Sequence, residues 1–156
     1  MTDLVQPAAD VVREARTYIG TPWVHQGRSR QGLDCLGLAS LVARNTRGYT
    51  FDVLNYQAQA TDETMLQLCR QHMLPVPAVA RQPGDVVVIR YGNQRHMAIV
   101  GDHPVVGELT LIHASSVHGR GRPCHGRDDH RGRPRSGRLG RPRDGCGWPC
   151  DARRRH

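Results

Sequence analysis

Cys35 is the residue in this chain best placed to do chemistry. It follows a glycine-marked turn and opens a segment with helical apolar spacing, in the stretch Gly-Leu-Asp-Cys-Leu-Gly-Leu at 32–38. A thiol in the first turn of a helix faces unpaired backbone N–H groups and the positive end of the helix dipole. Both favour the thiolate, which is the nucleophilic form. We therefore expect a lowered pKa and a nucleophilic role for Cys35, although a free cysteine is more often a small core residue.

Two histidines could complete a catalytic set with this thiol. His96 opens an expected strand at 96–100, and His113 ends another at 109–113. If these strands pair as a hairpin, both rings project from one face, and His113 could hydrogen-bond to His96 and fix its tautomer. A nucleophile, a base and a group that orients the base are the parts of a cysteine–histidine hydrolase. The alternative is that both are ordinary strand-end histidines.

Other side chains near the thiol are weaker candidates. Asp34 precedes the expected helix in a tight turn, and His25 lies in a loop close enough in sequence to line a cleft. His72 is expected on an exposed helix face. Cys69 is expected on an apolar face and therefore in the core.

The elements that must position these residues change in type along the chain. Apolar spacing predicts helices at 8–19, 35–45 and 62–73, the last of them capped by Thr61. A Pro-Gly-Asp turn at 83–85 then leads into expected strands at 86–90, 96–100 and 109–113. Helices followed by an antiparallel sheet indicate the α+β class.

The chain divides at residue 118. Residues 1–118 read as one globular domain in which ten Arg balance ten Asp and Glu, whereas 119–156 hold twelve Arg and four Asp, for a net charge of +8. The chain has no Lys, and residues 119–156 have no Val, Ile, Phe, Tyr or Met. A segment of this composition cannot bury enough apolar surface to offset its ordering entropy.

Three interpretations of residues 119–156 remain open. The segment could be a disordered basic tail that binds nucleic acid or an anionic wall polymer. It could hold a metal ion through its Cys and His residues, although their spacing fits no common zinc site. It could instead be an out-of-frame product of GC-rich coding sequence, which we favour because the change is abrupt. The candidate metal ligands are Cys124, His125, His130, Cys146 and Cys150.

Composition also limits the location of the chain. No apolar run approaches the length of a membrane span, and the first residues lack a basic segment followed by an apolar one. We expect a chain without a signal peptide that is made in the cytoplasm with reduced thiols. We expect no metal or organic cofactor and no membrane partner.

The order of the motifs resembles the NlpC family of cell-wall cysteine peptidases, which have a papain-like fold. The five matching segments, each weak alone, are Gly20-Thr21-Pro22-Trp23, Asp34-Cys35-Leu36-Gly37-Leu38, Pro83-Gly84-Asp85-Val86-Val87, His96-Met97-Ala98-Ile99-Val100-Gly101 and Leu111-Ile112-His113-Ala114-Ser115. The variant Asp-Cys-Leu-Gly-Leu, with His-Gln-Gly-Arg at 25–28 upstream, is most similar to the phage tail-associated branch.

The resemblance implies a catalytic set of Cys35, His96 and His113 that acts on a peptidoglycan stem peptide, at a γ-D-glutamyl–diaminopimelate amide. Trp23 stands where the family usually has a Tyr near the oxyanion site. Partners would then be the stem peptide and phage tail proteins, and the chain would be carried in a tail to the cell wall. Two other classes remain open: a catalytically weak or inactive tail assembly protein, and a nucleic-acid-binding protein that acts through residues 119–156.

Overall fold

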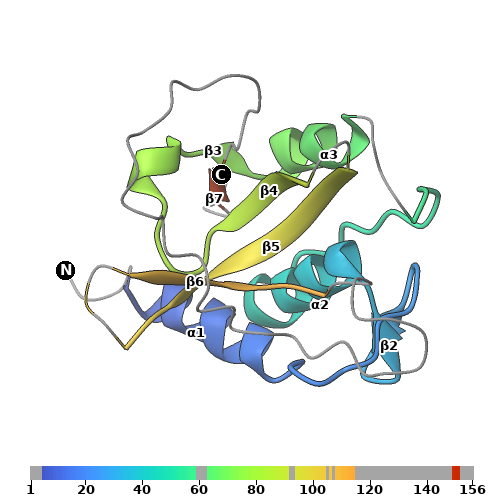
Figure 1. Ribbon diagram of the computed structural model, residues 1–156, viewed down its shortest axis with the longest axis horizontal. Coiled ribbons are helices and arrows are strands. Elements are labelled where there is room, and N and C mark those ends of the chain that lie inside the picture. The colour runs from blue at the N-terminus through green and yellow to red at the C-terminus, as the bar shows by residue number, and fades with distance from the viewer. Residues whose placement is uncertain are drawn as a thin grey trace.

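The chain folds as helices packed on an antiparallel sheet, which confirms the α+β class (Figure 1). The computed structural model describes residues 5–58, 63–91, 94–104, 106, 108–114 and 149–151. The helices are α1 (Val5–Arg16), α2 (Cys35–Arg47) and α3 (Thr64–His72), with a 3₁₀ turn η1 (Ala78–Ala80). The strands are β1 (Arg28–Ser29), β2 (Gly32–Leu33), β3 (Leu74–Pro75), β4 (Val86–Tyr91), β5 (Gln94–Asp102), β6 (Leu109–Ile112) and β7 (Pro149–Asp151).

The main sheet is built around β5, its longest strand in the described residues. Its order is β3-β7-β4-β5-β6, and every pair is antiparallel. Val86 pairs with Ile99 across the β4–β5 hairpin, and Ile99 pairs with Ile112 on β6. The predicted turn before β4 is confirmed: Gly84 has a φ of 93°, and the buried Asp85 carboxylate accepts a hydrogen bond from the Gln82 backbone N–H at 2.7 Å. This register places the ends of β5 and β6 that carry the two histidines next to each other.

Two hydrophobic clusters hold the layers together. The larger one joins the inner faces of the three helices to one face of the sheet, through residues such as Leu38, Leu66 and Met97. In Figure 1, α1 and α2 lie along the same side of the sheet, and both pack against β5. The smaller cluster, centred on Ala98 and Val100, lies on the other face of β5, as the period-two pattern of a strand requires.

The end of the first helix differs from the sequence-based expectation. The sequence predicts that the first helix includes Tyr18 and Ile19, but α1 ends at Arg16. The chain then continues as far as Gly20 in turns that are closed by i→i+3 hydrogen bonds. Tyr18 stays buried, whereas Ile19 is 42% exposed, so its expected place on the apolar stripe is wrong. The capping role of Thr61 lies outside the described residues, and the described N-cap of α3, Glu63, makes no side-chain cap bond.

Most of the segment 119–156 also lies outside the described residues. The exception is β7, which pairs with β3 through Leu74 and Asp151 and with β4 through Val86 and Cys150. These three residues thus add a short strand to the sheet. The prediction of a tail separate from the fold did not include this strand. The interpretation of the rest as disordered or out of frame stays a prediction.

The start of α2 is packed so closely that it requires glycine at position 37. A Cβ there would lie 2.1 Å from the carbonyl oxygen of Gly27 and 3.3 Å from an Asp34 carboxylate oxygen. Because position 37 is a glycine, the segment at 25–29 can lie against the first turn of the helix.

We predict that Gly37→Ala lowers the free energy of unfolding by about 1–3 kcal/mol, because backbone atoms must move to admit the methyl group. Urea denaturation would measure this. The matched control is Ser40→Ala on the same helix. The buried Ser40 hydroxyl has no hydrogen-bond partner among the described residues, so its loss should cost less than about 0.5 kcal/mol. Equal stability of Gly37→Ala and the unmodified protein would contradict the packing argument.

Candidate active site

A buried carboxylate fixes the position of Cys35. Asp34 is the N-cap of α2 and is only 2% exposed. Its Oδ1 accepts the Gly37 backbone N–H at 2.8 Å, and its Oδ2 accepts the Gln26 backbone N–H at 2.7 Å and the Tyr56 hydroxyl. An N-cap carboxylate satisfies orphan N–H groups of the first turn. The residue next to it, Cys35, is therefore held at a defined point of the helix start.

Arg28 connects this carboxylate to two loops. Its Nη1 donates to Asp34 Oδ1 at 3.3 Å and to the Tyr56 hydroxyl at 3.1 Å. Its Nε donates to Asp52 Oδ1 and its Nη2 to the Val53 carbonyl, both at 2.8 Å. The guanidinium thus joins the segment after α2 to the turn that precedes the helix.

The Cys35 thiol is less ionisable than the sequence suggested. Burial raises its pKa to about 11, and the neighbouring Asp34 charge adds to the rise. Backbone N–H groups of Met97, Leu36 and Cys35 itself lower the pKa but do not outweigh burial. The expectation of a lowered pKa is wrong for this structure, because the cost of desolvating a thiolate exceeds the stabilisation at the helix start. Cys35 is only partly exposed and packs against the core.

His96 lies on β5, the strand whose backbone contacts this thiol. The hydrogen bond from Met97 places the sulfur next to the backbone of β5, one residue after His96. Asp34, one residue before Cys35, is in turn close enough to His96 to raise the pKa of its imidazole slightly. Burial and the neighbouring His113 act more strongly in the opposite direction and lower that pKa to about 4. At neutral pH the site therefore holds a neutral thiol and a neutral imidazole.

The expected contact between the two histidines is confirmed. His96 Nε2 lies 2.8 Å from His113 Nδ1, and the two rings meet edge to face at 85°. When His96 Nε2 carries the hydrogen, His113 Nδ1 accepts it, and His96 Nδ1 is then unprotonated. In this tautomer, Nδ1 of the His96 imidazole is the basic nitrogen.

The remaining candidates form an aromatic wall near Asp34. The His25 ring stacks on Trp23 at a centroid distance of 6.3 Å and meets Tyr56 edge to face at 5.2 Å. His25 Nδ1 lies 3.7 Å from Asp34 Oδ2. The Asp34 carboxylate accepts a hydrogen bond from the loop and as a carboxylate cannot donate one to an oxyanion. The place of Asp34, Trp23 and His25 in an oxyanion or cleft group stays a prediction.

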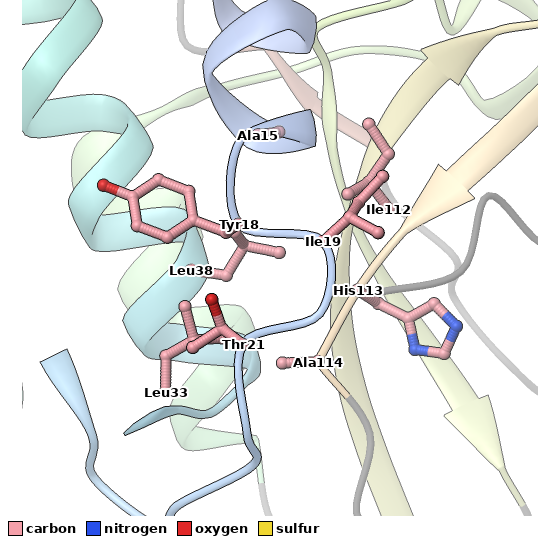
Figure 2. Close-up of a pocket in the computed structure, with 9 residues that line it drawn as sticks. All are labelled: Ala15, Tyr18, Ile19, Thr21, Leu33, Leu38, Ile112, His113 and Ala114. Atoms are coloured by element: carbon pink, nitrogen blue, oxygen red, sulfur yellow. The ribbon is translucent and has the colours of Figure 1, made fainter. Parts of the chain in front are cut away.

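A small apolar cavity lies behind His113. The volume of the cavity is about 10 Å³, and Tyr18, Leu33 and Leu38 are among the residues that line it. Figure 2 shows that the His113 ring points away from these three side chains. A space of this size could hold about one water molecule, so it is a packing defect and no substrate site.

Within the part of the chain that the structure describes, no three His, Cys, Asp or Glu side chains are placed to hold a metal ion. The proposed metal ligands Cys124, His125, His130 and Cys146 lie outside that part, and only the backbone of Cys150 is described. None of the described helices combines the length and the apolar character needed to cross a membrane.

Comparison with known proteins identifies the family. The NlpC/P60 family model matches residues 20–126, which is more than half of the chain and includes all three residues of the candidate set. The chain belongs to the NlpC/P60 family. No curated protein sequence matches it.

Two solved structures resemble this NlpC/P60 chain. The NlpC/p60 domain of the peptidoglycan hydrolase SagA is 25% identical, with a TM-score of 0.45 over 69% of this chain and 80% of that one. A lipoprotein-like NLP/P60 protein from Staphylococcus aureus is 20% identical, with a TM-score of 0.49 over 80% of this chain and 36% of that one. Membership of the family supports cell-wall hydrolysis as the general class of activity.

Sequence reasoning on this NlpC/P60 chain missed Arg28, Asp52 and Tyr56 as part of the site. Arg28 contacts Asp34, Asp52 and Tyr56, which lie 6 to 28 residues away in the chain, and Tyr56 also contacts Asp34. A single Arg on the two-residue strand β1 and a single Tyr in a loop carry no periodic signal, so only the tertiary structure could join them.

We predict that His96 titrates far below the ordinary histidine pKa of 6.5. The midpoint measured by NMR on its ring protons should lie near 4, because burial and His113 both oppose protonation. Only neutral imidazole can accept a proton, so kcat/KM should stay high at pH 5 and fall as the pH drops through that midpoint. In His113→Gln the midpoint should rise, since one opposing group is gone. A midpoint at or above 6.5 in the unmodified protein would contradict the buried, paired position of His96.

Proposed function

We propose that this chain is a cysteine peptidase that hydrolyses an amide bond in the stem peptide of peptidoglycan, namely the γ-D-glutamyl–diaminopimelate bond. The observation that carries the proposal is the hydrogen-bonded pair His96–His113, in which His96 is followed on β5 by Met97, whose backbone contacts the Cys35 thiol at the start of α2. Membership of the NlpC/P60 family supports the substrate class. The exact bond rests on the resemblance in the sequence.

The proposed reaction uses the neutral thiol and imidazole as a general-base pair. His96 Nδ1 takes the thiol proton while the sulfur of Cys35 attacks the amide carbonyl. The backbone N–H of Cys35, at the start of the helix, helps to hold the oxyanion. His96 then protonates the leaving amine, which gives a thioester on Cys35. Water attacks this thioester with His96 as base, and the carboxylic acid and the free thiol are released.

His113 acts on this reaction by orienting the base. Its Nδ1 accepts the hydrogen of His96 Nε2, which keeps His96 Nδ1 unprotonated and fixes the plane of the ring. As the imidazolium forms during attack, the same contact helps to carry the positive charge. His113 needs no proton of its own on that nitrogen, so other acceptors can serve in its place.

We further propose that the chain is made in the cytoplasm and carried in a phage or phage-like tail to the cell wall, with tail proteins as partners. The support is the variant Asp-Cys-Leu-Gly-Leu and the His-Gln-Gly-Arg segment before it. The +8 charge of residues 119–156 favours a second candidate activity, binding of nucleic acid through that segment. Salt-dependent DNA binding that disappears when residues 119–156 are deleted would support this second activity.

We predict that Cys35→Ala lowers hydrolysis of muropeptides by at least about 1,000-fold, because the nucleophile is absent. Release of diaminopimelate-containing products, separated by chromatography, measures the rate. Cys69→Ala is the matched control: the Cys69 thiol forms no disulfide and is buried in α3, so its variant should retain nearly full activity. Full activity in Cys35→Ala, or equal losses in both variants, would rule out the assignment.

We also predict unequal roles for the two histidines. His96→Ala should cost about as much as Cys35→Ala, since the base and the nucleophile act as a unit. His113→Gln should lose only about tenfold, because the amide oxygen can still accept the hydrogen of His96 Nε2. The same kinetic measurement on both variants checks this. Complete loss in both variants, with intact folding by circular dichroism, would contradict the division of roles.

A further inference from the structure

We propose that Arg28 is a positioning residue for the nucleophile, and that it acts through Asp34. By binding the Asp34 carboxylate and the loop at 48–58 together, it holds the start of α2 beside His96 and compensates the negative charge next to the thiol. This inference rests on the proposed role of Cys35 as nucleophile.

The contacts of Arg28 support a dedicated role. Its side chain is only 16% exposed, and Nε, Nη1 and Nη2 all donate to protein oxygens. Two of these acceptors, the Asp52 carboxylate and the Val53 carbonyl, lie in the loop after α2. A planar guanidinium can reach acceptors in three directions at once, whereas an ammonium group cannot reproduce this fork.

The charge of Arg28 matters because Asp34 lies between it and the reacting groups. Without a compensating cation, a buried carboxylate next to Cys35 would make the thiolate harder to form and would favour a protonated His96. Of the described groups that contact Asp34, Arg28 is the one with a permanent positive charge. The titratable and charged groups around Asp34 are His25, Arg28 and Tyr56, which contact it, and His96, on which its charge acts. Beyond these, His113 contacts His96 and Asp52 contacts Arg28.

Tyr56 takes part in the same arrangement. Its hydroxyl donates to Asp34 Oδ2 and accepts from Arg28 Nη1 at 3.1 Å, so it bridges the two charges. It contributes no charge of its own at neutral pH. Tyr56→Phe therefore removes one donor to Asp34 while the Arg28 cation stays in place, which separates hydrogen bonding from charge.

The test is the pH dependence of Cys35 alkylation by iodoacetamide in the full chain, followed by mass spectrometry of the peptide that contains Cys35. In Arg28→Gln the alkylation rate at pH 8 should fall about three- to tenfold, with its midpoint displaced to higher pH. Arg28→Lys should restore part of the rate, because it keeps the charge but cannot reproduce all the hydrogen bonds of the guanidinium. The matched control is Arg30→Gln, since Arg30 binds Thr17 and stacks over Tyr18 without contacting Asp34, and its variant should alkylate as the unmodified protein does.

Kinetics with muropeptides then separate this role from a purely structural one. Arg28→Gln should lower kcat and shift the acid limb of the pH profile to higher pH, as His96 gains a proton more easily. An unchanged alkylation midpoint in folded Arg28→Gln would overturn the proposal. If Arg28→Gln does not fold, Arg28→Lys decides: an alkylation rate below that of the unmodified protein supports the proposal, and an unchanged rate overturns it. Because alkylation needs no substrate, a failure of the peptidase assignment would appear separately, as absence of hydrolysis with the alkylation differences intact.

Discussion

The buried carboxylate of Asp34 is the interaction on which the site depends. It caps α2, accepts hydrogen bonds from the loop before the helix and from Tyr56, and pairs with Arg28. A buried charge is tolerated only when donors and an opposite charge surround it, so the two loops and the helix start must assemble together. Cys35 is the next residue, and its location follows from this assembly.

The same arrangement explains why the thiol and the imidazole are both neutral at rest. Cys35 packs between the helix and β5, and His96 is buried against His113, so each charged form is penalised by desolvation. A nucleophile of this kind depends on a base that is already deprotonated and correctly oriented. The contact between His96 Nε2 and His113 Nδ1 provides that orientation. We propose that the reaction of this chain depends on the geometry of the two groups more than on a preformed thiolate.

Local patterns were sufficient to predict the parts of this site that lie on regular elements. Period-two alternation placed His96 and His113 on one sheet face, and the glycine-marked turn placed Cys35 at a helix start. The Arg28 contacts could not be predicted, because they join loops without periodicity. The pKa of Cys35 was predicted in the wrong direction, because burial of one side chain is decided by the packing of distant segments. The short strand β7 was missed for a similar reason, since residues 119–156 carry no strand-like alternation.

The central claim is that Cys35 becomes covalently acylated by a stem peptide. Rapid quenching of the full chain with a muropeptide in acid, followed by mass spectrometry of its peptides, tests this claim most directly. We predict a thioester on the peptide that contains Cys35, with an added mass equal to the acyl half of the substrate. We also predict that this thioester accumulates in His113→Gln, in which its hydrolysis is slowed. Turnover of the muropeptide with no acyl group on Cys35, or an acyl group on Cys69 instead, would contradict the account.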